Sequence, residues 1–386
     1  MEKKKILHIS KYYPPFKGGI EQVAYNVVNA LKSTENYMQE VFCFNEKEED
    51  ILNDNYEDIK VIRVGSKKKV SSQSMNSKYG KYLYDEFSSF NPDIVVFHYP
   101  NPFAAHFLLK AFRKYNFKGK FVLYWHCDII KQKVLKTLFV KQNYALLDRA
   151  DTIIATSPAY LEGTDYLPKY KEKVKVIPLC IGKERTNVTE EQKIKANEIK
   201  SKYKDKKIIF FFGRHTEYKG LRYLIESDQY LKQDKCQIII GGKGELTEEL
   251  KKQASIYKNI EFVGRLSDDD INSYLMACDI FAFPSITRNE AFGISLAEAM
   301  YFGKPACTFT IPGSGVNWVC PNNECGLEAP NRDVRVYANN INKLITDNEL
   351  YDKLSHNSIK RVNDLFTIDN FKSNVINVYN QLDKKQ

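Results

Sequence analysis

The most informative segment for the fold class is Ile280-Phe-Ala-Phe-Pro-Ser-Ile-Thr-Arg-Asn-Glu-Ala-Phe-Gly-Ile-Ser-Leu-Ala-Glu-Ala-Met-Tyr-Phe-Gly303. The apolar run Ile280–Phe283 predicts a buried strand, and the polar residues after Pro284 predict a loop. From Gly293 onward, apolar residues recur three and four positions apart, which predicts a helix with one buried face. That buried face is expected to consist of Leu296, Ala297, Met300 and Tyr301. A strand that leads through a loop into a helix is the repeating unit of a parallel α/β sheet.

The same unit recurs along the rest of the chain. A first series of strand-like runs comprises Lys5–Ile9, Val41–Phe44, Val61–Val64, Ile94–His98, Phe121–Trp125 and Thr152–Ala155. A second series comprises Ile208–Phe212, Gln237–Ile240, Ile260–Val263, Ile280–Phe283 and Ala306–Phe309. Between the two series lie a last strand that runs into an exit, Val174–Gly182, and a polar, Lys- and Glu-rich stretch over 183–206. The pattern predicts two doubly wound domains, whose strand ends line a cleft between two facing sheets.

The composition of the 386-residue chain is typical of a folded protein with about two domains. Apolar residues make up 43% and charged residues 27%, so packed cores are expected. The 8 scattered cysteines indicate reduced core thiols rather than a disulfide framework or a zinc site. No apolar run approaches ~18 residues, which argues against a transmembrane helix and favours a cytoplasmic protein. A formal net charge of +10 suits phosphorylated ligands or anionic lipid, and no nucleic-acid-binding signature accompanies it.

Two glutamates bracket the start of the helix predicted from Gly293. Backbone N–H groups at a helix start form an anion site, and a glycine there allows a phosphate to approach closely. Glu290 lies in the preceding loop, where it can accept a hydrogen bond from a ligand hydroxyl, and Glu298 lies farther along the helix. Two carboxylates around a phosphate site suit a sugar nucleotide, one for the hexose and one for the ribose diol. The alternative is a strand–loop–helix unit with two solvated glutamates.

A second charged element, Phe212-Gly-Arg-His-Thr-Glu-Tyr-Lys-Gly220, follows the first strand of the second series. Arg214 and Lys219 bracket its turn and can clamp a diphosphate, because a guanidinium binds phosphate oxygens in pairs and an ammonium adds a point charge. Fixed cations of this kind complement the negative charge of a bound diphosphate. The alternative is a basic turn before a helix.

The loop after the first strand of the chain contains Gly18 and Gly19. It precedes an amphipathic helix predicted over 20–33, so it has the position of a loop that lets a phosphate approach a helix start. A pair of glycines in a turn is equally compatible with a purely structural role.

Two strand ends in the first series carry histidines. His126 and Asp128 follow Phe121–Trp125 and are expected to project toward the cleft, with Asp128 orienting the His126 ring. His98 and Asn101 occupy a similar strand end, and these two residues and Asp128 are candidates for contact with an acceptor. A histidine at a strand end also serves structure in many proteins, so both interpretations remain open.

Together these elements resemble the family 4 retaining glycosyltransferases of GT-B fold, over nearly the whole chain. The first motif that carries the resemblance is Glu-x7-Glu, from Glu290 to Glu298, followed by Ala-Met-x-x-Gly-Lys-Pro. The second is Gly-Arg-x5-Lys-Gly, from Gly213 to Gly220. The resemblance implies an α/β protein with the GT-B fold, in which two facing Rossmann-like doubly wound domains enclose an interdomain cleft.

The resemblance also assigns a task to each domain. Residues 1–182 would form the acceptor-binding Rossmann-like domain, and residues 183–366 the domain that binds the nucleotide sugar. A C-terminal helix over 367–386 would pack back onto the first domain.

The resemblance implies a role for each candidate residue. Glu290 would contact the transferred sugar and Glu298 the ribose, while the charges of Arg214 and Lys219 neutralise the leaving diphosphate. His126 would position the donor sugar and add polarity at the transition state, without attacking it. The remaining residues implied to bind the donor are Gly18, Gly19, Gly242, Gly264, Arg265, Leu266, Phe292, Gly293 and Ile294.

The implied reaction is retaining transfer of a hexose from a nucleoside-diphosphate sugar to a hydroxyl of a lipid-linked or growing polysaccharide, with no metal or other cofactor. Pro312–Val319 and Trp125–Lys133 look most like bacterial mannosyl- or rhamnosyltransferases of O-antigen or capsule assembly, which favours GDP-mannose over a UDP-hexose. A non-catalytic nucleotide- or glycan-binding subunit is the alternative of another class. A hydride-transfer enzyme is the weaker rival, because Gly241-Gly-Lys-Gly244 is an incomplete dinucleotide fingerprint.

Two segments invite other interpretations. Asp268-Asp-Asp270 contains the Asp-x-Asp pattern of metal sites in another glycosyltransferase fold, but with Ser267 before it helix capping explains it better. The basic and apolar run 131–141 is suited to peripheral attachment at the inner face of the cytoplasmic membrane. An ordinary amphipathic helix that covers the sheet is the alternative for this run.

Overall fold

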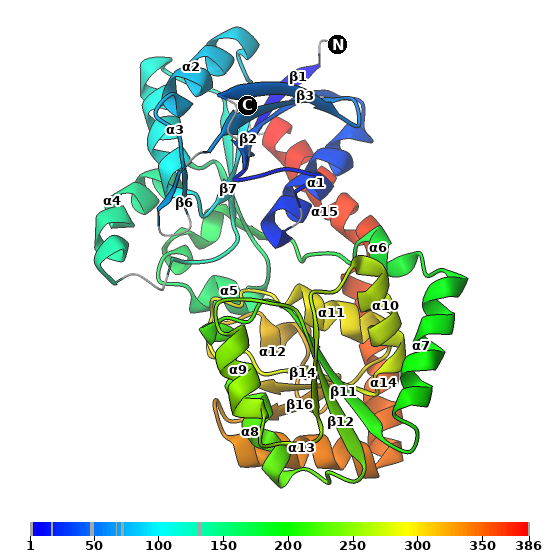
Figure 1. The fold of residues 1–386 in the computed structure, drawn as a ribbon. Coiled ribbons are helices and arrows are strands. Elements are labelled where there is room, and N and C mark those ends of the chain that lie inside the picture. The colour runs from blue at the N-terminus through cyan, green and yellow to red at the C-terminus, as the bar shows by residue number, and fades with distance from the viewer. Residues whose placement is uncertain are drawn as a thin grey trace. The chain divides into compact units, whose positions relative to one another are not determined.

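The structure is a computed structural model that describes residues 3–16, 18–46, 50–66, 68–70, 73–129 and 133–384. The chain divides into two compact units, each with its own parallel sheet and helices on both sides of it (Figure 1). Unit 1 comprises Met1–Pro178 and Phe371–Gln386, and unit 2 comprises Leu179–Asn370.

Unit 1 contains an eight-stranded sheet in the order β10-β9-β8-β7-β1-β2-β4-β3. Its strands are β1 (Lys4–Ile9), β2 (Tyr37–Asn45), β3 (Ile51–Tyr56), β4 (Ile59–Gly65), β7 (Ile94–Tyr99), β8 (Lys120–Trp125), β9 (Thr152–Ala155) and β10 (Val174–Val176). All pair in parallel except β3, which pairs with β4 in the antiparallel sense. The helices are α1 (Gly19–Lys32), α2 (Tyr79–Phe90), α3 (Pro102–Lys114), α4 (Lys133–Arg149), α5 (Pro158–Gly163) and the 3-10 turn η1 (Leu167–Lys173). A separate antiparallel pair consists of β5 (Lys68–Val70) and β6 (Gln73–Met75).

Unit 2 contains a six-stranded, fully parallel sheet in the order β13-β12-β11-β14-β15-β16. Its strands are β11 (Lys207–Phe212), β12 (Cys236–Gly241), β13 (Ile260–Gly264), β14 (Ile280–Phe283), β15 (Ala306–Phe309) and β16 (Gly326–Ala329). The helices are α6 (Lys183–Thr186), α7 (Glu190–Lys202), α8 (Leu221–Ser227), α9 (Thr247–Ala254), α10 (Asp268–Ala277), α11 (Ile294–Tyr301), α12 (Val316–Val319), α13 (Val334–Thr346) and α14 (Asn348–Leu365). Two 3-10 turns, η2 (Glu217–Lys219) and η3 (Asp228–Tyr230), flank α8.

The C-terminal helix α15 (Ile368–Lys384) contributes its residues from Phe371 onward to unit 1. Its Tyr379 ring is fully buried and meets the edge of Tyr37 at 6.2 Å. The sequence predicts 367–386 for this return. The observed division and the predicted one therefore differ by about four residues.

The order of strands reverses once in each sheet. In unit 1 the chain moves outward from β1 in one direction and from β7 in the other, and these two strands are neighbours. In unit 2 the same relation holds for β11 and β14. We call each such place a switch point. The loops that leave the carboxyl ends of the two central strands diverge there, so a ligand can enter between them.

The central strands are buried on both faces, which explains why they appear in the sequence as continuous apolar runs. On β11, Ile208 and Phe210 enter one hydrophobic cluster and Ile209 and Phe211 enter another on the opposite face. Helix α11 contributes to the first cluster through residues such as Leu296. Burial of each such side chain stabilises the fold by about 1.5–3 kcal/mol. A strand covered by helices on both faces carries no polar alternation.

The parallel strands and helices predicted from the sequence are confirmed, with small differences. Tyr301 is half-buried rather than buried, whereas Leu296, Ala297 and Met300 are fully buried. Four strands escape prediction, namely β3, the short β16 and the antiparallel pair of β5 and β6. Seven of the eight cysteines are buried and only Cys127 is partly exposed. None of the helices in the described part of the chain is long and apolar enough to cross a membrane.

Candidate functional site

The switch point of unit 2 brings two predicted residues into direct contact. Lys219 lies in the loop after β11, Glu290 lies in the loop after β14, and the Lys219 ammonium donates to a Glu290 carboxylate oxygen. The hydroxyl of Ser285 donates to the same oxygen at 3.3 Å. The cation expected to bind a diphosphate and the carboxylate expected to bind a sugar therefore neutralise one another.

Backbone contacts fix the separation of these two loops. The Ile286 amide donates to the Tyr218 carbonyl at 2.9 Å, which joins the two loops directly. Gly220 has φ of +64°, and a Cβ there would overlap the Pro284 carbonyl oxygen. Only glycine satisfies both conditions at this position. Backbone packing thus fixes the spacing of the two loops that carry Lys219 and Glu290.

Burial shapes the charge of this site. Lys219 is 8% exposed, and its ammonium lies 5.2 Å from the centroid of the Phe283 ring. Burial alone lowers the pKa of Lys219, but attraction to Glu290 outweighs it and the pKa is raised. Arg214 is exposed, with a guanidinium nitrogen 3.5 Å from the Tyr218 hydroxyl. The site therefore has a buried neutral pair beneath an exposed cation.

The start of α11 provides backbone donors beside Glu290. Gly293 caps this helix with φ of +88°, and the first turn contains no acidic residue. The Phe292 ring is buried against Phe366 at 5.4 Å, so this residue can offer only its backbone to a ligand. The Ser314 hydroxyl donates to the Glu290 carbonyl and holds the loop in place. Phe292, Gly293 and Ile294 thus lie at a helix start, a position where backbone N–H groups can bind an anion.

Glu298 lies on the same helix but is not solvated. It is 7% exposed, and its Oε1 accepts from Arg185 Nε at 3.0 Å. Burial raises the pKa of Glu298 to about 7, although the Arg185 charge opposes that rise. Arg185 was not identified from the sequence, because one arginine in the polar stretch 183–206 carries no periodic or motif signal.

The remaining predicted donor residues of unit 2 gather beside β12 and β13. The Gly242 amide donates to the Gly264 carbonyl at 2.6 Å. Both glycines line a cavity of about 310 Å³ together with Lys243, Thr247, Lys251, Phe262 and Val263. Arg265 is exposed, while Leu266 packs against Gly241. The structure thus places Gly242 and Gly264 together and gives Leu266 a structural contact as well.

Beside the switch point of unit 1, the carboxyl ends of β7 and β8 carry two neutral rings. His126 Nε2, just after β8, lies 3.0 Å from His98 Nδ1 on β7, and the two rings are stacked. His98 also stacks on Tyr124 at 4.8 Å between centroids. Burial lowers the pKa of His126 to about 3 and lowers that of His98 well below its ordinary value. Both imidazoles are therefore neutral at physiological pH.

Three expectations for unit 1 need correction. Asp128 does not bind the His126 ring, because its Oδ1 accepts from Trp125 Nε1 at 2.8 Å and its amide donates to the Tyr160 hydroxyl at 2.6 Å. His98 is 0% exposed, so it offers no surface to an acceptor. Asn101 is 1% exposed and caps α3 by accepting from the Ala104 amide at 3.3 Å. The partner that orients His126 is thus His98.

The glycines of the first loop differ in their surroundings. Gly18 caps α1 in an extended conformation, and a Cβ there would overlap the Glu21 carboxylate. A Cβ on Gly19 would meet no atom within 4 Å. Gly19 therefore faces open space, which leaves room for a ligand at the start of α1.

Helix capping accounts for Asp270 of the Asp-x-Asp pattern, whereas the Asp268 carboxylate accepts from Arg185 and that of Asp269 from Gln192. Ser267 and Asp270 form a reciprocal capping box at the start of α10. No group of three or more His, Cys, Asp or Glu side chains within the described ranges is arranged to hold a metal ion. Of the basic run 131–141, residues 131 and 132 lie outside the described residues, and α4 begins at Lys133.

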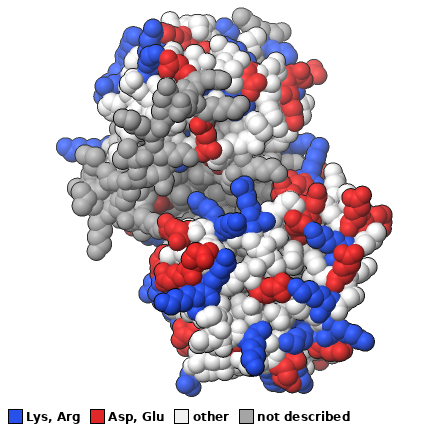
Figure 2. All heavy atoms as spheres, viewed as in Figure 1, with Lys and Arg blue, Asp and Glu red and all other residues white. Residues whose placement is uncertain are grey.

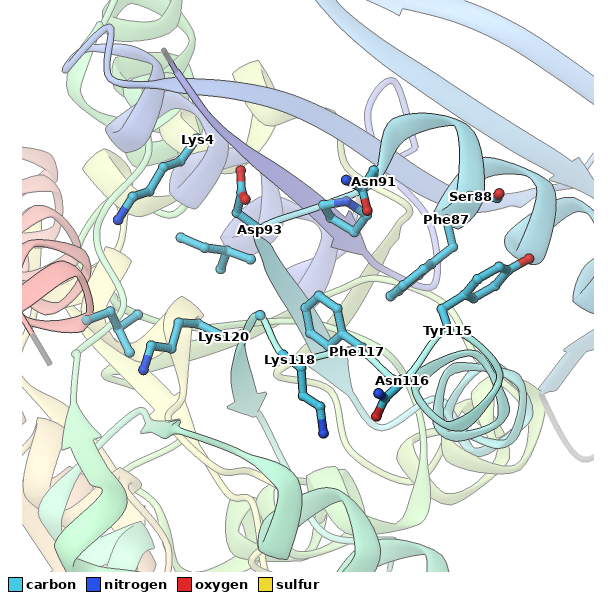
Figure 3. A pocket seen from close by; sticks show the side chains of 14 residues that line it. Lys4, Phe87, Ser88, Asn91, Asp93, Tyr115, Asn116, Phe117, Lys118 and Lys120 are labelled. Carbon is cyan, nitrogen blue, oxygen red and sulfur yellow. The ribbon is translucent and has the colours of Figure 1, made fainter. Parts of the chain in front are cut away.

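A larger cavity lies at the other end of the unit 1 sheet. It measures about 650 Å³ and is lined by 14 residues, including Lys4, Asp93 and Lys120 (Figure 3). β1 and β8 begin at Lys4 and Lys120, so this cavity lies at the strand starts. The histidines and Gly19 lie at or beyond the strand ends, so this cavity is not part of their site.

Charge is mixed on the surface of unit 2 that faces the viewer. Lysine and arginine are interspersed there with aspartate and glutamate (Figure 2). The net charge of +10 is therefore not collected in one basic stripe on that face.

Both halves of the chain match family models. Residues 17–185 match Glycosyltransferase Family 4, and residues 192–361 match Glycosyl transferases group 1. Together the two models span the loop of Gly18 and Gly19, His126 and both charged elements of unit 2.

Relatives and solved structures agree with these matches. The chain is 29% identical to O-antigen chain mannosyltransferase C of Escherichia coli, over 98% of each chain. It is 30% identical to the D-rhamnosyltransferase WbpZ of Pseudomonas aeruginosa, over 71% of this chain and 70% of that one. The crystal structure of Anabaena Alr3699/HepE in complex with UDP-glucose superposes with a TM-score of 0.75 at 18% identity, covering 98% of this chain and 99% of that one. The chain therefore belongs to glycosyltransferase family 4 and is a glycosyltransferase of GT-B fold with two Rossmann-like domains.

Proposed function

We propose that this glycosyltransferase moves a hexose, with mannose of GDP-mannose favoured, onto a hydroxyl of a lipid-linked or growing polysaccharide with retention of anomeric configuration. The observation that carries the proposal is the contact of Lys219 with Glu290 at the switch point of unit 2. A sugar nucleotide would separate this pair, because its phosphate binds the ammonium and a sugar hydroxyl donates to the carboxylate. The phosphate thus takes the place of the Glu290 carboxylate beside Lys219, and the sugar hydroxyl takes the place of the Lys219 ammonium beside Glu290.

The proposed chemistry needs only groups of the substrates and fixed charges of the protein. The acceptor hydroxyl oxygen forms a bond to the anomeric carbon on the face from which the phosphate oxygen leaves. The acceptor proton passes to that leaving phosphate oxygen, so the products are the glycosylated acceptor and the nucleoside diphosphate. Lys219 and Arg214 stabilise the charge that develops on the diphosphate. Neutral His126 supplies a polar contact for the sugar without taking part in covalent bonding.

The favoured base is guanine and the runner-up is uracil. Two similar proteins are named as a mannosyltransferase and a D-rhamnosyltransferase, which supports a GDP-activated sugar. The similar solved structure contains UDP-glucose, which supports a UDP-hexose. Its identity to this chain is 18%, so it informs the fold and carries less weight for the donor.

The acceptor and the setting belong to the same proposal. The O-antigen relative supports a glycan acceptor, and a lipid-linked acceptor would place the enzyme peripherally on the inner face of the cytoplasmic membrane. The basic run 131–141 is the proposed contact. The proposed reaction has no metal requirement, which a transfer assay with and without EDTA tests directly.

Ligand binding and turnover test the proposal together. Thermal unfolding is measured with GDP, UDP, ADP and NAD, and a ligand at 100 times its dissociation constant should stabilise by about 2.7 kcal/mol. GDP is expected to stabilise most. Transfer from GDP-mannose to polysaccharide acceptors is then followed, and the anomeric configuration of the product is read by NMR. Stabilisation by NAD alone would refute the proposal, and nucleotide binding without transfer to any acceptor would indicate a non-catalytic subunit.

A further inference from the structure

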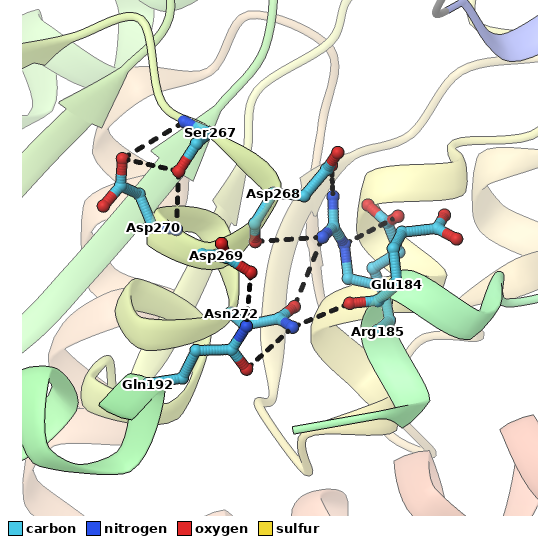
Figure 4. A network of polar contacts seen from close by, with 9 residues as sticks. Glu184, Arg185, Gln192, Ser267, Asp268, Asp269, Asp270 and Asn272 are labelled. Carbon is cyan, nitrogen blue, oxygen red and sulfur yellow. Dashed lines mark hydrogen bonds and ion pairs between the residues drawn. The ribbon is translucent and has the colours of Figure 1, made fainter. Parts of the chain in front are cut away.

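A buried arginine from α6 lies at the centre of a polar network in unit 2 (Figure 4). Arg185 is 4% exposed and reaches both the start of α10 and the middle of α11. Nothing in the proposed reaction assigns it a task. Long charged side chains are rarely buried to this extent unless they are paired.

The guanidinium of Arg185 is nearly saturated with acceptors. Its Nε donates to Glu298 Oε1 at 3.0 Å, and Nη2 donates to Asp268 Oδ1 at 3.0 Å. Its Nη1 donates to the Asp268 carbonyl at 3.2 Å and to Asn272 Oδ1 at 3.3 Å. A guanidinium has five N–H donors in a rigid fork, so these four bonds fix its plane.

A second set of hydrogen bonds fixes the residues that surround Arg185. Asn272 Nδ2 donates to the Glu184 carbonyl at 2.7 Å and lies 3.2 Å from Gln192 Oε1. Gln192 Nε2 in turn donates to Asp269 Oδ1 at 2.7 Å. The arginine is therefore anchored at its backbone as well as at its tip, as Figure 4 shows.

We infer that Arg185 is a positioning residue for nucleotide recognition, which orients the Glu298 carboxylate so that it accepts the two hydroxyls of the donor ribose. The inference rests on the proposed function for its ligand. Arg185 occupies one lone pair of Glu298 Oε1, and no other described residue bonds to this carboxylate. The remaining lone pairs are the ones a diol can use.

The charge of Arg185 is as important as its shape. Even beside this guanidinium, burial holds the pKa of Glu298 at about 7. Without the guanidinium, the nearby Asp268 and Glu184 would favour the protonated acid still more. A protonated carboxyl has lost part of its accepting capacity, so it binds a diol less well.

The competing explanation is a purely structural clamp that ties α6 to α10. A structural clamp would lower stability when removed, but it would weaken ribonucleotide and 2′-deoxyribonucleotide binding equally. A positioning role predicts a selective loss, because only the ribonucleotide has the second hydroxyl.

Calorimetric binding of paired nucleotides separates the two explanations. The probes are GDP with 2′-deoxy-GDP and UDP with 2′-deoxy-UDP, measured at pH 8 on the full chain. A hydrogen bond to a charged group is worth about 1.5–3 kcal/mol, so the wild type should prefer the ribonucleotide roughly ten- to hundredfold. Arg185→Met should reduce this preference to about twofold while 2′-deoxynucleotide affinity changes little. Arg185→Lys should lose most of it as well, because an ammonium cannot reproduce the fork.

Control variants keep the result interpretable. Lys195→Met removes the cation that pairs with Asp270 on the same helix α10, so it should leave the preference unchanged. Glu298→Gln keeps one acceptor oxygen but loses the charge, so it should retain only a small part of the preference, and adding Arg185→Met to it should change nothing further. This double variant also removes both partners together, which guards against a failure of Arg185→Met to fold.

Each outcome has one meaning. An unchanged ribose preference in Arg185→Met, or equal weakening of both nucleotides, would overturn the inference and leave the proposed function standing. A further loss of preference when Arg185→Met is added to Glu298→Gln would overturn it too. Failure of the wild type to bind either ribonucleotide would overturn the proposed function and the inference with it.

Discussion

The two switch points share one strand order but use opposite chemistry. In unit 2, a buried ammonium and a carboxylate meet between β11 and β14. In unit 1, the equivalent place between β1 and β7 adjoins stacked neutral imidazoles. The same backbone arrangement therefore supports a charged centre in one sheet and an uncharged polar centre in the other.

The difference teaches how each centre can meet a ligand. A charged pair that is neutral overall exchanges its partners readily for a phosphate and a hydroxyl, since the ligand supplies both. A neutral imidazole has no charge to attract a phosphate, but its donor and its acceptor nitrogen can bind a hydroxyl without a change of charge. We therefore expect the charged pair of unit 2 to bind the phosphate and the sugar, and the imidazoles of unit 1 to bind a hydroxyl.

The largest effect is expected from Glu290→Gln. The amide has no negative charge and only one acceptor oxygen to offer the reacting sugar, so transfer should fall by about 10³-fold. The measurement is kcat at saturating donor. A kcat within threefold of the wild type would show that Glu290 does not contact the reacting sugar. The contrast between the charged pair of unit 2 and the neutral imidazoles of unit 1 would then no longer hold.

A stability control belongs with this variant. Glu290→Gln leaves the Lys219 ammonium buried without its partner, which should lower the melting temperature. Adding Lys219→Met removes both charges and should restore much of that loss without restoring activity, because a buried pair replaced by neutral groups is nearly neutral for stability.

Variants of His98 test the role of the two neutral imidazoles of unit 1. His98→Leu should lower kcat by about tenfold with little change in KM, the scale of loss when the partner that orients a functional histidine is removed. His98→Asn should retain most of the activity, because its amide nitrogen lies where Nδ1 of the imidazole was. Equal loss in both variants, with equal loss of melting temperature, would make His98 a core residue only.

The pH dependence of nucleotide affinity also distinguishes the two units. Because the pKa of Glu298 is raised to about 7, roughly ten times more of it is ionised at pH 8 than at pH 6. Nucleotide affinity should therefore rise about tenfold over this range in the wild type and stay flat in Glu298→Gln. No step from His126 is expected there, since its pKa is about 3.

The free energy of unfolding should change with pH in the direction opposite to nucleotide affinity. The folded state binds the Glu298 proton more tightly than the unfolded chain, whose ordinary value is 4.5. The resulting stabilisation is complete below pH 4.5 and is lost as pH rises through about 7. The difference in unfolding free energy between the wild type and Glu298→Gln should show this fall. Affinity and stability that rise together would contradict the assignment.

The smallest effect is expected at Gly19. Gly19→Ala meets no atom within 4 Å, so it should stabilise the protein by about 0.5 kcal/mol through the unfolded chain. If a phosphate approaches this loop, the new methyl group should raise the donor KM about threefold. An unchanged KM would assign the loop to structure and confine donor binding to unit 2.

The sequence predicts most of this architecture because buried parallel strands are apolar throughout. It fails at β3, whose Ile51–Tyr56 alternates half-buried and exposed residues on a polar background. It also fails to single out Arg185, whose partners Asp268 and Glu298 lie 83 and 113 residues away. The direction of Asp128 is missed for a similar reason, because residues after a strand end follow the loop rather than the pleat.

The uneven burial of the cysteines has a practical consequence. Burial raises the pKa of the Cys43, Cys236 and Cys278 thiols to about 12, so they react slowly with alkylating reagents. Cys127 is the partly exposed thiol, and it lies between His126 and Asp128. The native chain thus contains its own chemical probe. The rate at which this thiol is labelled reports its exposure in the loop after β8, with no engineered residue needed.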